Sequence, residues 1–137
     1  MAVEVTDDRH ANTKAGADIS SGDAVQIGLL GAKGVPWYMA LALTDKGVVF
    51  YQNEGDGHEL LKTVDCAVVR DDKGTLTRYE LRMPLAAIGL EPGDEFGFNL
   101  MIFDSDDEKG QSRWLQMAPG VDHPVRPSLY PRFVLGE

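Results

Sequence analysis

The chain is poor in cysteine. Cys66 is the only one among 137 residues, so no intrachain disulfide can form, and neither a CxxC pair nor a Cys/His cluster with metal-ligand spacing is present. No apolar run approaches the roughly 20 residues that a membrane-spanning helix needs. These absences exclude a disulfide scaffold, a cysteine-based metal site and a membrane span. Cys66 lies in a strand-like run, and we interpret it as a small buried hydrophobe.

Motifs of catalysis are also missing. The sequence has three histidines and no G-x-S-x-G elbow, P-loop or H-E-x-x-H motif. Acidic residues outnumber basic ones by 22 to 13, and the resulting net charge of −9 repels the phosphate backbone of nucleic acids. We therefore expect neither an enzyme nor a nucleic-acid-binding protein.

Short strands are the main structural signal. From Thr77 to Met83, apolar residues alternate with Arg78, Glu80 and Arg82, which is typical of a half-buried antiparallel strand. Similar short runs, separated by Gly, Pro, Asn and Asp, predict eight or nine strands, around residues 3–5, 25–29, 37–43, 48–51, 64–69, 77–83, 96–103, 114–117 and 132–135. The pattern predicts one all-β domain over residues 1–137, an antiparallel β-sandwich of the jelly-roll or immunoglobulin-like kind.

One short helical turn is expected between Pro84 and Leu90. Proline suits the first turn of a helix, and Gly89 can end it in a left-handed cap. The following strand, residues 96–103, is apolar on both faces, which predicts a central position in its sheet.

The order of several motifs carries a family resemblance. An opening V-T-D-D-R-H-A-N run is followed by G-D-A-V-Q-I, then Y-E-L-R-M-P-L, F-G-F-N-L leading into D-S-D, a late tryptophan and a closing P-R-F-V-L. Together they resemble the family 9 carbohydrate-binding modules and the broader DOMON-like sandwich superfamily. The resemblance implies a non-catalytic module that recognises plant cell-wall or related polysaccharides. It also implies an extracellular or periplasmic location, with any export signal upstream of Met1.

The chain departs from the family at its start. Members usually begin with a Trp-containing segment and an additional first strand, and this sequence lacks both. A missing strand leaves an unpaired sheet edge. We therefore expect a homodimer formed through that open edge.

Sugar sites of the resembled family combine aromatic stacking with polar contacts to hydroxyls. The chain has two tryptophans, Trp37 and Trp114, and each is either a stacking platform or a packing residue. The polar residues that we expect to contact sugar stand in an early loop or in late strands: His10, Asn12, Asn99, Arg113 and Gln116. For His10 and Asn99, hydrogen bonding within the protein is the competing interpretation.

Calcium is the metal that we expect, in a structural role. It prefers several oxygen ligands, and members of the resembled family often carry it. The densest acidic run supplies Asp104, Asp106 and Asp107. An EF-hand is excluded because glycine falls one position late, at Gly110, and Leu115 replaces the final glutamate. The alternative is an ordinary solvated loop.

Two other functions remain open at this stage. Relatives of the sandwich hold haem between a methionine and a histidine, which would here be Met39, Met101 or Met117 with His10 or His123. Such a domain would transfer electrons. The third possibility is a structural sandwich of a larger secreted protein, which would show an exposed apolar patch and bind no ligand.

Overall fold

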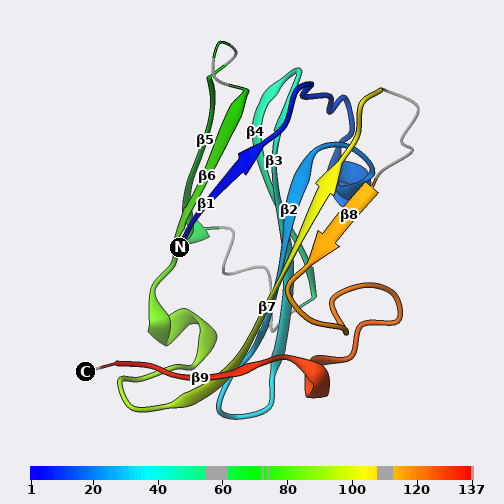
Figure 1. The fold of residues 1–137 in the computed structure, drawn as a ribbon. Helices are drawn as coiled ribbons and strands as arrows, with labels where there is room; N and C mark the ends of the chain where they lie inside the picture. Colours follow the sequence, from blue (N-terminus) through cyan, green and yellow to red (C-terminus); the bar gives the residue numbers. More distant parts are fainter. Residues whose placement is uncertain (55–61, 72, 74, 108–112, 137) are drawn as a thin grey trace.

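The computed structural model describes residues 1–54, 62–71, 73, 75–107 and 113–136. Two antiparallel sheets face each other (Figure 1). The smaller sheet has the order β1-β6-β5, with β1 at Ala2–Thr6, β6 at Leu76–Arg82 and β5 at Asp65–Asp71. The larger has the order β4-β3-β2-β7-β8: Gly47–Glu54, Pro36–Thr44, Ala24–Leu30, Glu95–Asp104 and Arg113–Gln116. A short strand, β9 (Arg132–Val134), pairs with the first residues of β7.

The main core lies between the two sheets. In β6 the side chains of Thr77, Tyr79 and Leu81 are buried, whereas those of the intervening arginines and glutamate are exposed, as the alternation predicted. These residues face the larger sheet, where Ile27, Met39 and their neighbours on alternate positions of β2 and β3 are buried. The predicted all-β sandwich is therefore confirmed.

The short helical turn is also confirmed. It is a 3₁₀ helix, η3 (Leu85–Ile88), and it ends at Gly89, whose φ of 69° is left-handed. Strand β7 lies between β2 and β8, so its predicted central position is confirmed too. Two further 3₁₀ helices, η1 (Gly16–Ser21) and η4 (Pro127–Leu129), were not predicted.

The outer face of the larger sheet is partly covered by loops. At one end Ile19 of η1 packs against small side chains of β2 and β3. At the other end Tyr130 packs with Tyr38 and Val121. Tyr130 approaches so closely that a Cβ atom at Gly28 would lie 2.5 Å from its ring, so only glycine fits at that point of β2. Among the described residues, no helix is long and apolar enough to cross a bilayer.

Candidate functional site

Strand β8 carries the exposed tryptophan. Trp114 is 54% exposed and lies opposite Phe103 of β7, on the outer face of the larger sheet. Gln116, two residues later, lies on the same face, because alternate residues of a strand point to the same side of the sheet. Directly paired residues of neighbouring strands also share a face, and Gln116 pairs with Met101. Arg113 and Leu115 point to the other face. Strand β8 lies at the outside of the sheet in Figure 1, so the Trp114 indole is open to a ligand.

Asn99 positions the chain that follows β8. Its side chain is fully buried, and its amide nitrogen donates to the carbonyl oxygens of Ala118 and Pro119 at 2.8 and 3.1 Å. Its oxygen accepts the backbone N–H groups of Leu100 and Ala118. All of its partners are backbone groups, so Asn99 has no capacity left for sugar. This geometry favours the competing interpretation, hydrogen bonding within the protein, over a direct sugar contact.

Trp37 is also not a sugar platform in this structure. It is 5% exposed and packs in the core between the sheets, on a strand that has neighbours on both sides. Its side chain is therefore almost entirely covered by protein, which favours a packing role over a stacking one. The interpretation as a packing residue accounts for its position.

The two polar residues of the early loop are engaged within the protein. Asn12 donates to the carbonyl oxygens of Ile19 and Asp23 and accepts the N–H of Lys14. The Nε2 atom of His10 lies 2.8 Å from the carbonyl oxygen of Leu43, and its Nδ1 atom lies 3.2 Å from Oδ2 of Asp23. Neither residue lies with Trp114 on β8. Both hold the loop against the sheets.

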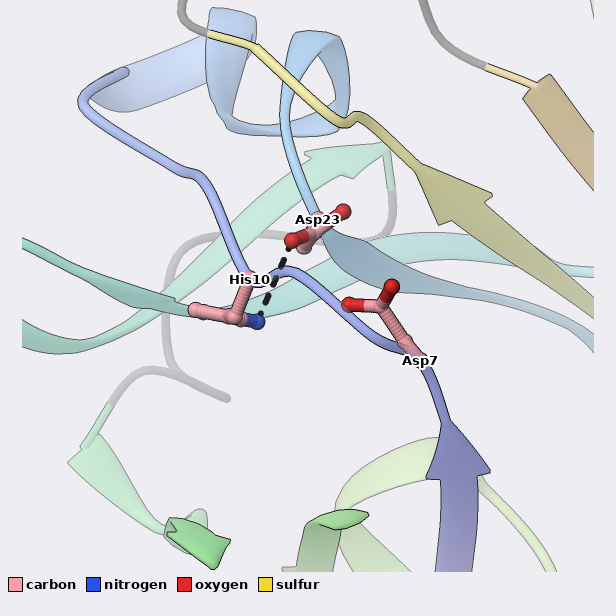
Figure 2. A group of neighbouring side chains, drawn as sticks. All are labelled: Asp7, His10 and Asp23. Carbon is pink, nitrogen blue, oxygen red and sulfur yellow. Dashed lines mark ion pairs between the residues drawn. The ribbon is translucent and has the colours of Figure 1, made fainter. Parts of the chain in front are cut away.

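The His10 side chain belongs to a cluster with Asp7 and Asp23 (Figure 2). Asp23 is almost fully buried, and its two oxygens accept the N–H groups of Ala11 and Ser105. Burial nevertheless raises the pKa of the Asp23 carboxyl above its ordinary value. Asp7 lies beside Arg70, with 3.6 Å between carboxylate and guanidinium.

The predicted calcium ligands are not brought together as a set. Among the residues that the structure describes, Asp106 groups with Asp7 and Asp8, whereas Asp104 and Asp107 are outside that group. The Asp107 carbonyl accepts the Ser105 hydroxyl. Three carboxylates are hard oxygen ligands of the kind that calcium prefers, so calcium at this position remains a prediction.

The third notable region is an apolar groove of about 1000 Å³ between the sheets. The three-stranded sheet is narrower than the six-stranded sheet. It therefore leaves part of the inner face of the six-stranded sheet uncovered. Residues of both sheets and of η3 line the groove, including Leu29, Leu81, Ile88, Phe96, Phe98 and Phe133. Phe133 contacts both other phenylalanines, with ring centroids 5.9 and 6.2 Å apart. Since its lining is mostly apolar, the groove suits another apolar surface better than a sugar.

The residues named for a haem alternative are spread over both faces of the larger sheet. Met39 is buried between the sheets, whereas Met101 is buried on the outer face of the larger sheet. His10 uses both ring nitrogens within the protein, and His123 lies on the outer side with its ring 6.4 Å from that of Tyr38. The described residues thus give no specific support to a Met–His pair.

Solved structures with the same architecture identify the fold. Two structures of a family 9 carbohydrate-binding module from Caldicellulosiruptor kristjanssonii, one in complex with cellotriose and one with glucose, match with a TM-score of 0.74 each. They are 16% identical to the chain, which they cover over 98 and 99% of its length, while 67 and 70% of their own chains are matched. This chain has the family 9 module fold. At the level of sequence alone, no protein-family model and no curated protein matches it.

Two features of the molecule were missed from the sequence. The groove was missed because it depends on how many strands each sheet receives. The grouping of Asp7 and Asp23 with His10 was missed, because the two aspartates are 16 residues apart in the sequence. The D-D-x-H spacing after β1 and the G-D before β2 were the available signals.

Proposed function

We propose that the protein is a non-catalytic carbohydrate-binding module that recognises plant cell-wall or related polysaccharides through Trp114. The carrying observation is the open indole of Trp114 on an outer strand of a sandwich whose fold is shared with two sugar-binding modules. Large aromatic side chains are normally covered in a folded domain, so an uncovered tryptophan on a regular strand suggests a ligand platform.

The chemistry of the surface supports this proposal. The C–H face of a pyranose ring is apolar and matches the face of an indole, while the hydroxyls at the ring edge need polar partners. Gln116 supplies a half-buried amide on the same face of β8. Asn99 acts indirectly, because it fixes the backbone of Ala118 and Pro119 immediately after β8.

The test is a calorimetric titration with cello- and xylo-oligosaccharides. Trp114→Ala is expected to weaken binding at least about tenfold, or about 1.4 kcal/mol, because a stacking tryptophan is a typical hot spot. Leu115→Ala is the matched control, since Leu115 is 70% exposed on the same strand but faces the other side. Binding that survives in Trp114→Ala, or the absence of heat with every sugar, would contradict the proposal.

A further inference from the structure

The contacts of His10 require a positive charge beside its ring. A carbonyl oxygen only accepts hydrogen bonds, so the 2.8 Å contact with Leu43 places a hydrogen on Nε2. In the neutral ring, Nδ1 then carries a lone pair, and this lone pair faces the Asp23 carboxylate at 3.2 Å. Two acceptors at that distance repel unless a proton or a metal ion lies between them.

A small hollow lies around the contact between His10 and Asp23. A hollow of about 10 Å³, roughly the size that holds one water, is lined by Asp7, His10, Asp23 and Asp104 together with apolar and hydroxyl side chains. The ligand atoms of Asp7, His10 and Asp23 lie within 4.8 Å of one another. In addition, Oδ1 of Asp104 is buried and has no hydrogen-bond partner among the described residues. A buried carboxylate oxygen without a partner is costly, and a cation would satisfy it.

The charges around the hollow also favour a cation. Three carboxylates, those of Asp7, Asp23 and Asp104, line the hollow. Arg70 pairs with Asp7, and His10 faces Asp23. The hollow therefore collects more negative than positive charge.

We propose that Asp7, His10 and Asp23 bind one Zn²⁺ ion, with Asp104 as a supporting carboxylate in the lining of the hollow. The imidazole nitrogen and carboxylate oxygens are the donors that zinc takes in fours, whereas calcium prefers six to eight oxygens. The Leu43 carbonyl holds the Nε2–H and so presents Nδ1 to the metal, which is the usual outer-sphere support of a histidine ligand. Asp23 keeps both backbone hydrogen bonds, because a carboxylate has about four lone-pair sites.

The site would join three segments that are distant in the sequence. Asp7 and His10 follow β1, Asp23 precedes β2, and Asp104 ends β7. These segments connect the smaller sheet to the larger one at a single end of the sandwich. Bound zinc is therefore expected to stabilise the native state, and this effect is independent of sugar binding.

The experiment titrates Zn²⁺, Mn²⁺ and Ca²⁺ separately into the chelator-treated full chain, by calorimetry and thermal melting. We expect one equivalent of Zn²⁺ to bind and to raise the melting temperature. His10→Gln and Asp104→Asn should each weaken binding about tenfold or more, in line with what loss of supporting groups costs metal sites. His123→Gln is the matched control, because it removes a histidine remote from the hollow, and its affinity should be unchanged.

Three results would overturn the proposal. The first is no saturable Zn²⁺ binding to the folded wild type, in which case a proton occupies the space between His10 and Asp23. The second is unchanged affinity in both His10→Gln and Asp104→Asn. The third is tight Ca²⁺ binding that excludes Zn²⁺ and ignores His10→Gln. The wild-type titration and Asp104→Asn decide the matter even if His10→Gln fails to fold.

Discussion

The two tryptophans lie in opposite environments within the same sheet. Trp37 stands on β3, which is paired on one side with β2 and on the other with β4, and it faces the smaller sheet. Trp114 stands on β8, beyond β7, with its ring open to solvent. Each occurs in a short run that the sequence predicts as a strand. The difference shows that the position of a strand in the sheet order, together with the face that the residue occupies, decides whether an aromatic side chain stabilises the fold or meets a ligand.

The largest expected effect is on stability. Trp37→Ala should lower the free energy of unfolding by about 3–5 kcal/mol, because it leaves a cavity in the main core. Trp114→Ala should change it by no more than about 0.5 kcal/mol, as is usual for an exposed residue. Urea unfolding followed by circular dichroism measures both. Equal losses in the two variants would remove the distinction between a core tryptophan and a site tryptophan.

An intermediate effect is expected from the residue that supports β8. Asn99→Ala removes one side chain that bonds four backbone groups, so we expect a loss of about 1–3 kcal/mol in unfolding free energy. Because the backbone after β8 is then less fixed, sugar affinity should also fall. Asn53→Ala is the control, since Asn53 is exposed on β4. Unimpaired stability of Asn99→Ala would show that the chain after β8 is held by other contacts.

The smallest expected effect concerns the open edge of the smaller sheet, at β1. Met1 and Leu81 exchange backbone hydrogen bonds, so by the alternation of an antiparallel ladder the N–H groups of Ala2 and Glu4 face away from β6. This free edge lies beside the apolar groove, because Met1 and Ala2 line it. The homodimer expected from the sequence would pair two such edges and cover the groove.

Sedimentation velocity over a range of protein concentrations measures this association. Added salt should strengthen it, because each chain carries a net charge of −9. Ala2→Pro removes an outward N–H and should shift the equilibrium to monomer, whereas Ala2→Ser should not. A strictly monomeric wild type at high concentration would exclude the dimer.

Local sequence patterns were sufficient to predict the fold, but not which of the candidate site residues are exposed. The alternation in β6 identified the buried Thr77, Tyr79 and Leu81, and the Pro84 to Gly89 signals located η3, because these features depend on neighbouring residues. Nothing local to Trp37 indicates that β4 covers its strand on the far side. The same limit explains Asn99, whose backbone partners stand about 20 positions later in the chain and are brought to it by the turn after β8.

The cluster around His10 shows the limit most clearly. The acidic run from Asp104 to Asp107 predicted a metal site within one loop. The structure instead brings Asp104 to a hollow with Asp7, His10 and Asp23, and this required the pairing of β2 with β7. Sequence composition thus identified the kind of residue involved, whereas the grouping depended on sheet order.

The register of the long-range strand pairs also bears on how the chain reaches its native state. Ala2 of β1 pairs with Glu80 of β6, and Ala24 of β2 pairs with Phe103 of β7. Each of the first two strands therefore has a partner strand that is synthesised much later. The pairs β2–β3, β3–β4, β5–β6 and β7–β8 join consecutive strands, whereas β1–β6 and β2–β7 join strands that are distant in the sequence. Closing such long loops is entropically costly before any contact is gained, and folds of this kind take milliseconds to seconds. We therefore expect β1 and β2 to remain without their distant partners until nearly the whole domain has left the ribosome.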